Sequence, residues 1–155
     1  MSSNVKEVEK NVFSSYFSCV KKYCQFRGRS SRYEYWSFVL INFIIGLILG
    51  YVETIKGEPA TMSGAYSIFI ALPSLAAQTR RLHDINKSGW WLGGLLLMIF
   101  MFGVIQGIVE YSGHIINDTI SQILVIIALI WTILLLIFYI KKGNGEENRF
   151  GVPQE

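Results

Sequence analysis

Residues 80–91 of the chain read RRLHDINKSGWW, and the rest of the sequence is organised around this stretch. It is the most polar segment between two long apolar runs, at residues 60–79 and 90–109, and both runs end at it. Each run is close to the ~20 residues that a helix needs to cross the ~30 Å apolar core of a membrane. The stretch therefore predicts a charged connection between two membrane-spanning helices.

Composition favours a membrane protein over a soluble one. The chain has 155 residues, of which 52% are hydrophobic and 16% charged, whereas soluble domains carry roughly 25% charged residues. The apolar residues also fall into four blocks of near-spanning length rather than one pattern suited to a single core. We predict an all-α membrane protein whose four transmembrane helices form a bundle, at about residues 36–52, 60–79, 90–109 and 119–140.

Two further segments flank this transmembrane domain, which we place at residues 30–140. In residues 1–29 the apolar residues recur at helical spacing from Val5 onward, with lysines and serines on the other side. Such an amphipathic helix suits the membrane–water interface, although packing on the bundle itself would explain the same pattern. Residues 141–155 form a glycine-containing polar tail.

The first span opens with signals for a helix start. Ser31 and Glu34 have the S-x-x-E spacing of a capping box, which predicts a helix beginning near Ser31. Trp36 follows at the depth where tryptophan anchors a helix to the interface. We assign these three residues structural roles.

Three more residues have structural roles in the second and third spans. Pro73 lies inside the second span, where neighbouring groups can satisfy the carbonyl that it frees and where we expect a kink. Trp90 and Trp91 open the third span as a pair at headgroup depth.

The distribution of charge predicts the orientation. Of the 14 Lys and Arg residues, all but Lys56 lie in the N-terminal segment, in residues 80–91 or in the tail. Because cytoplasmic loops of membrane proteins carry the excess of Lys and Arg, we place both termini in the cytoplasm.

Three stretches together resemble DUF805, a family of small bacterial inner-membrane proteins of uncharacterised function. They are FRGRSSRYEYW at residues 26–36, RRLHDINKSGWW at residues 80–91 and GEENRFG at residues 145–151. The usual family pattern is approximately GR-x-x-R-x-E-Y-W, then R-R-x-H-D-x-x-x-S-G-W-W, then G-x-N-x-[YF]-G. The resemblance covers residues 26–151. It implies several membrane helices and a location in the bacterial cytoplasmic (inner) membrane, without bringing an established activity.

The three stretches meet on the cytoplasmic side in the predicted topology, which suggests one polar cluster. Arg80 and Asp84 are four residues apart and would share a helix face, and Asp84 and Glu34 are the obvious partners for arginines. Basic pockets between spans bind anionic lipid headgroups, so the cluster is a candidate lipid- or anion-binding site; alternatively, its charges only hold loops together. Its members are Arg27, Arg29, Arg32, Arg80, Arg81, His83, Asp84, Lys87, Asn148 and Arg149.

Other functions find less support in the sequence. A zinc site needs three or four ligands, and the second histidine, His114, falls across the membrane from His83; we therefore assign no metal, cofactor or catalytic residue. A small transporter or channel component is the first alternative, although the spans contain no charged residue. A membrane enzyme that uses His83 and Asp84 is the second.

The expected partners follow from the membrane location. They are membrane lipids and either a second copy of the chain or another membrane protein. Two G-x-x-x-G pairs, in the first and third spans, suit the seam of a homodimer or, equally, helix packing inside one bundle. Topology already explains the basic residues, so we expect no nucleic acid.

Overall fold

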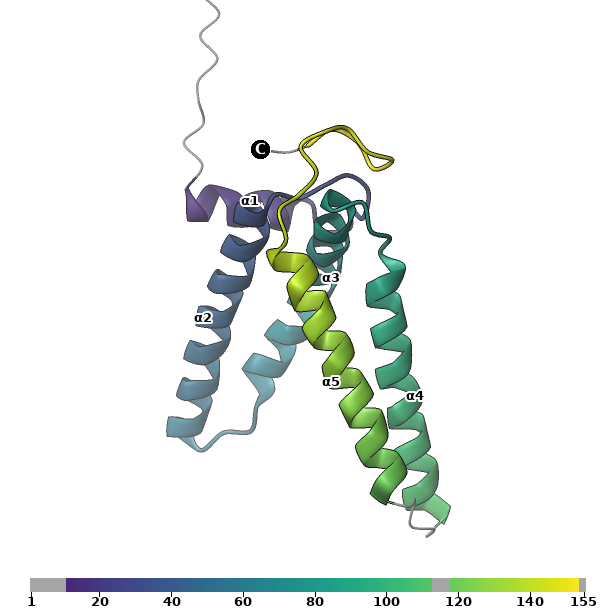
Figure 1. Cartoon of the computed structure of the whole chain (residues 1–155). Helices are drawn as coiled ribbons and strands as arrows, with labels where there is room; N and C mark the ends of the chain where they lie inside the picture. The colour runs from purple at the N-terminus through teal and green to yellow at the C-terminus, as the bar shows by residue number, and fades with distance from the viewer. Residues whose placement is uncertain (1–10, 113–117, 154–155) are drawn as a thin grey trace, which may run out of the picture.

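The computed structural model describes residues 11–112 and 118–153, which form five α-helices (Figure 1). Within these residues there is no strand, only an isolated bridge between Asn148 and Gly151. The predicted all-α class is confirmed. The helices are α1 (Val12–Lys21), α2 (Arg32–Lys56), α3 (Thr61–Asp84), α4 (Trp90–Ser112) and α5 (Asp118–Ile140).

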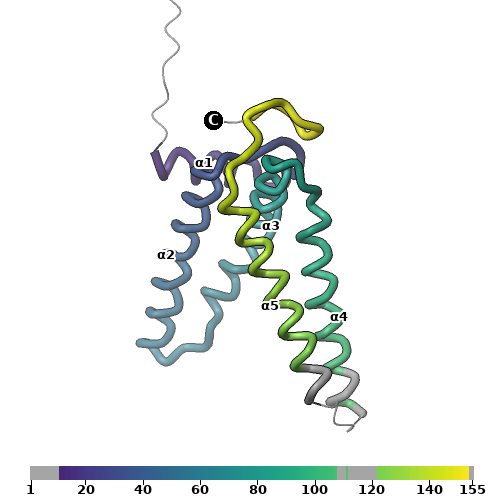
Figure 2. The backbone as a smooth tube through the Cα atoms, viewed as in Figure 1, coloured from purple at the N-terminus to yellow at the C-terminus, as the bar shows by residue number. Residues whose placement is uncertain are grey.

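Helices α2 to α5 alternate in direction, so the starts of α2 and α4 gather with the ends of α3 and α5 (Figure 1). We call this end of the molecule the polar end; it comprises residues 22–34, 80–90 and 139–153. Helix α1 lies across the polar end against α2, and the C-terminal segment folds back over it (Figure 2). Helix α2 packs on α3, and α4 on α5. Away from the polar end the two pairs separate (Figure 1).

Three of the described helices are long and apolar enough to cross a membrane: α2, α4 over Trp90–Gly107 and α5 over Gln122–Ile140. Many of their large apolar side chains face outward, and Phe43, Phe100 and Ile133 are each more than half exposed. Water would penalise such a surface, whereas the hydrocarbon of a bilayer accepts it. Helix α3 is as long, but its serines and a glutamine lower its apolar content.

Pro73 lies inside α3, and the carbonyl that it leaves free has a partner. Proline has no N–H, so it cannot bond to the carbonyl four residues earlier, which belongs to Phe69. The Tyr23 hydroxyl donates a hydrogen bond to this carbonyl at 2.8 Å. The segment between α1 and α2 thus satisfies the backbone of α3, while the expected kink at Pro73 stays a prediction.

Helix α1 is shorter than the sequence predicted. Asn11 and Ser14 form a capping box before Val12, while residues 1–10 lie outside the described part of the chain. The helix ends at Lys21 rather than near Gly28. Gly28 instead has a φ of +90°, in the left-handed region that glycine tolerates best, and serves as a turn.

The capping box expected at α2 is half formed. The Ser31 hydroxyl accepts a hydrogen bond from the Glu34 N–H at 3.2 Å, so Ser31 is the N-cap. The Glu34 side chain does not return to the Ser31 backbone, because its carboxylate is bound by residues of α1 and by Ser30. At the start of α4, Trp90 is largely exposed, whereas Trp91 packs against Trp131.

Candidate functional site

Asp84, at the end of α3, lies between two arginines in the interior of the polar end. Its Oδ1 is 2.8 Å from Nη2 of Arg29, and its Oδ2 accepts a hydrogen bond from Nη1 of Arg81. All three side chains are buried. Asp84 thus pairs with arginines, as the sequence suggested; its partner on α3 is Arg81, three residues away, and not Arg80.

Arg29 also holds the C-terminal segment. Its Nη1 donates to the carbonyls of Glu146 at 2.8 Å and Gly151 at 3.2 Å, and its Nη2 donates to the carbonyl of Asn144. A guanidinium offers five N–H donors in a fixed plane, which suits this convergence of acceptors. One side chain therefore joins the segment before α2, the end of α3 and the tail.

The neighbouring residues Arg80 and Arg81 bind the ends of two different helices. Arg80 Nη1 donates to the carbonyls of Gln25 at 2.6 Å and Lys22 at 3.2 Å, where α1 ends. Arg81 Nε donates to the carbonyl of Tyr139 at 3.0 Å, in the last turn of α5. Helix C-termini present unpaired carbonyls and a partial negative charge, which a cation neutralises.

His83 is buried against the tail. Its ring stacks on Phe150 with centroids 3.7 Å apart and planes at 4°, and its Nδ1 is 3.1 Å from the Gly28 carbonyl. Asn148 donates to the His83 carbonyl at 3.0 Å. Burial and, to a lesser extent, the positive charge of Arg149 lower the His83 pKa below its ordinary 6.5, against the opposing hydrogen bond to Gly28. The imidazole is therefore held in its neutral form at neutral pH.

The sequence suggested that Glu34 pairs with an arginine. In the structure Glu34 instead joins α1 to α2. Its Oε1 accepts hydrogen bonds from Lys22 at 2.9 Å and Ser18 at 3.0 Å, and its Oε2 accepts one from Ser30 at 2.8 Å. The carboxylate is nearly buried. This second network fixes α1 across the start of α2.

The ten residues of the predicted cluster thus separate by exposure. Arg29, Arg80, Arg81, His83 and Asp84 are buried and bound to the protein itself. Lys87 and Asn148 are half-buried, and the Lys87 ammonium lies 5.7 Å from the ring centre of Trp91. The remaining three are exposed: Arg27, Arg32 and Arg149.

A groove of about 590 Å³ lies beside these buried residues, between the start of α2 and the tail. We call it the basic groove. The sequence predicted only part of this groove. The remaining lining residues adjoin the family motifs but do not belong to them. Its lining consists of Ser31, Arg32, Tyr33, Trp36, Asp84, Ile140, Lys142, Gly143, Asn144 and Pro153.

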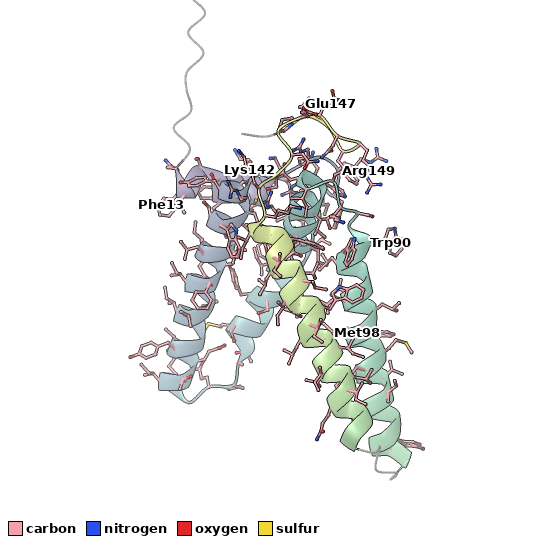
Figure 3. All side chains as sticks on the ribbon, in the orientation of Figure 1. Phe13, Trp90, Met98, Lys142, Glu147 and Arg149 are labelled. Atoms are coloured by element: carbon pink, nitrogen blue, oxygen red, sulfur yellow. The ribbon has the colours of Figure 1, made fainter. Side chains whose placement is uncertain are left out.

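The electrostatics of the basic groove favour an anion. Arg32 and Lys142 are exposed cations on opposite walls, and Lys142 projects from the polar end in Figure 3. The groove also contains the N-terminus of α2, whose partial positive charge attracts anions. Asp84 contributes a carboxylate, but Arg29 and Arg81 neutralise it.

The chemistry that this site offers is binding. Arg32 supplies a planar donor fork for phosphate or carboxylate, and Tyr33 and Trp36 add aromatic surface of the kind found at the membrane interface. Among the described residues, no group of three or more His, Cys, Asp or Glu side chains could hold a metal ion.

Comparison with known proteins gives consistent matches. The family described as "Protein of unknown function (DUF805)" matches residues 23–152. Inner membrane protein YhaH of Escherichia coli strain K12 is 32% identical over 141 residues, which cover 88% of this chain and 92% of that protein. Inner membrane protein YhaI of the same strain is 42% identical over 94 residues, covering 55% of this chain and 80% of that protein. No solved structure matches.

Proposed function

This chain belongs to the DUF805 family of membrane proteins, and we propose that it is a four-span protein of the bacterial inner membrane that binds a phosphate-bearing anion in the basic groove. Both termini lie in the cytoplasm. The inner-membrane relatives support the location, and the gathering of basic residues at the polar end supports the orientation.

Helix α3 is the fourth span in this proposal. Residues 61–79 carry no charge, and the helix packs on α2 and, less extensively, on α5. Its hydroxyl groups have partners: Ser67 donates to the Ser63 carbonyl at 2.8 Å, and Ser74 to the Ile70 carbonyl at 2.7 Å. Since satisfied polar groups are tolerated inside a membrane, the lower apolar content of α3 is compatible with spanning.

Helix α1 lies at the membrane–water interface. Phe13 and Phe17, one turn apart, are 68% and 58% exposed, whereas Ser15 and Cys19 face the protein. Two exposed phenylalanines on one face suit insertion among lipid headgroups. The position of α1 across the polar end places this face at the level where α2 begins (Figure 1).

The basic groove is the observation that carries the proposed function. The buried arginines are committed to the protein, so an anion would find its donors on Arg32 and Lys142. Basic pockets beside membrane spans on the cytoplasmic side bind phosphate groups. The function that we assign to the groove is recognition, since its cations and aromatic surface suit the binding of an anion.

A lipid-binding measurement tests the groove. The purified full-length protein in a zwitterionic detergent is titrated with phosphatidylglycerol or phosphatidylcholine, and bound lipid is counted by native mass spectrometry. Phosphatidylglycerol should bind more tightly, and the double variant Arg32→Gln/Lys142→Gln should lose most of this preference. The exposed Arg27, outside the groove lining, provides the matched control as Arg27→Gln. Equal binding by both variants would refute the proposal.

Cysteine labelling tests the topology. A variant with Cys19 and Cys24 replaced carries single cysteines at Lys56, Lys87, Tyr111 or Gly145, and intact cells are treated with an impermeant thiol reagent. Positions 56 and 111 should react and positions 87 and 145 should not. Reaction at 87 or 145 would separate the three motifs and remove the four-span arrangement.

A further inference from the structure

We infer that the occupant of the basic groove is an entire glycerophospholipid, with its phosphate in the groove and its ester group and one acyl chain in a second cavity between α2 and α3. The inference rests on the proposed anion binding and specifies the class of ligand. A soluble phosphate compound would use the groove alone.

The second cavity has a volume of about 310 Å³. Helix α2 contributes Tyr35, Phe38, Val39 and Phe43, and α3 contributes Ser74 and Gln78. The lining carries aromatic rings and uncharged polar groups but no charged side chain, in contrast to the basic groove. Its chemistry therefore suits the neutral, apolar part of a lipid.

The two cavities follow one another along the same face of α2. Arg32 and Trp36 line the groove, and Val39 and Phe43 line the second cavity. Their spacing of four, three and four residues places all four on one stripe of a helix. At 1.5 Å per residue the stripe is about 16 Å long, which spans the distance from a lipid phosphate into its acyl chains.

Two hydrogen-bond donors mark the level of the ester group. Tyr35 is 5% exposed and lines the second cavity, and its hydroxyl is a donor that a ligand in this cavity can use. Gln78 uses its Oε1 to accept from the Tyr139 hydroxyl at 3.2 Å, so its amide N–H groups remain for a ligand. Tyr35 lies in the first turn of α2, at the boundary between headgroups and hydrocarbon.

A ligand acceptor between the two donors would gain hydrogen bonds at the membrane boundary, where water competes less for them. The ester carbonyl of a glycerolipid is a neutral acceptor at this boundary, and it is joined to a phosphate on one side and an acyl chain on the other. A single phospholipid thus matches the cations above, the donors between and the apolar residues below.

Three ligands and one pair of variants test this inference with the full-length protein in detergent. The ligands are diester phosphatidylglycerol, its diether analogue, which lacks the ester carbonyls, and soluble glycerol 1-phosphate. The variants are Tyr35→Phe, which keeps the ring, and the matched control Tyr51→Phe, at the opposite end of α2 and 69% exposed.

We expect the diester lipid to bind about fivefold more tightly than the diether lipid, the effect of one net hydrogen bond. Tyr35→Phe should reduce diester binding by about the same factor and leave diether binding unchanged, and Tyr51→Phe should change neither. Glycerol 1-phosphate should compete only at far higher concentration.

Two results would overturn the whole-lipid inference while leaving the anion site intact. One is equal binding of diester and diether lipid in both the wild type and Tyr35→Phe. The other is competition by glycerol 1-phosphate at concentrations comparable to the lipid. If instead Arg32→Gln/Lys142→Gln retained full binding, the anion site itself would be refuted, and this inference with it.

Discussion

The guanidinium of Arg29 and the carboxylate of Asp84 lie 2.8 Å apart, and neither side chain is more than 8% exposed. The two residues are 55 positions apart in the chain and belong to the first and second motifs of the family. Through its bonds to carbonyls of residues 144, 146 and 151, Arg29 adds the third motif. Hydrogen bonds of Arg29 thus join the three motifs into one buried cluster, which we call the interlock. The basic groove lies along its edge.

Replacing Arg29 with lysine should release the tail and destabilise the protein. Lysine keeps the charge beside Asp84 but lacks the fork that reaches several carbonyls, so buried acceptors lose their partner. We expect a loss of about 3 kcal/mol in the free energy of unfolding, on the order of 1 kcal/mol for each of the three tail carbonyls that lose their donor. Unfolding by SDS, followed by tryptophan fluorescence, measures it.

The exposed Arg27 is the control for this experiment. Arg27→Lys should leave unfolding within about 0.5 kcal/mol of the wild type, as is usual for surface substitutions. If Arg29→Lys also lowered the free energy of unfolding by no more than about 0.5 kcal/mol, the interlock would contribute little to stability.

Periodicity and charge predicted most of the fold, because both are local properties of the sequence. The boundaries of the third and fourth apolar runs differ from those of α4 and α5 by only a few residues, since nothing but hydrophobicity decides them. The end of helix α1 was predicted less accurately. Its end at Lys21 depends on Arg80, which is 58 positions from the carbonyl that it binds at residue 22.

The residues of the predicted cluster lie at one end of the molecule, but the partners within it could not be derived from the sequence. Helical spacing placed Arg80 on one face with Asp84 without deciding which arginine binds it, and the carboxylate binds Arg81 and Arg29, a residue of another segment. The groove was missed for the same reason. Lys142 and Asn144 look like ordinary tail residues until the tail folds back on Arg29.

Gly143 should tolerate no side chain. A Cβ built at this position would overlap Oδ2 of Asp84, so Gly143→Ala must displace either the tail or the carboxylate. We expect a cost of about 1–3 kcal/mol, typical of overpacking, and faster hydrogen exchange in residues 144–151. The matched control is Gly145→Ala, where a Cβ meets nothing within 4 Å. Equal exchange in the two variants would contradict the prediction.

The hydroxyl of Tyr23 should matter only while Pro73 is present. Tyr23→Phe removes the donor to the Phe69 carbonyl and should cost about 1 kcal/mol. In a Pro73→Ala background the new N–H at position 73 can bond to the same carbonyl, so the Tyr23→Phe cost should fall toward zero. A double-mutant cycle on SDS unfolding measures this coupling. Additive effects would show that Tyr23 acts otherwise, for instance through its ring contact with Phe69.

Docking of the tail should weaken below pH 6.5 because of His83. The docked state lowers the His83 pKa beneath its ordinary 6.5, chiefly through burial. When the tail leaves, the ring is exposed and its pKa returns toward that value. Below pH 6.5 the undocked state therefore binds the proton first, so the docking free energy is full above pH 6.5 and declines as pH falls toward the lowered pKa.

Hydrogen exchange of residues 144–151, measured from about pH 7.5 to about pH 5.5 and corrected for intrinsic rates, follows this decline. His83→Gln removes the titrating group and the stacking on Phe150 but keeps an N–H for the Gly28 carbonyl. Protection in this variant should be lower throughout and nearly independent of pH. The comparison isolates His83 from carboxylates that titrate in the same range, because those are present in both proteins. If wild type and His83→Gln lost protection in parallel, the pH response would come from such a carboxylate, with Glu146 and Glu147 of the tail as the nearest in sequence to Phe150.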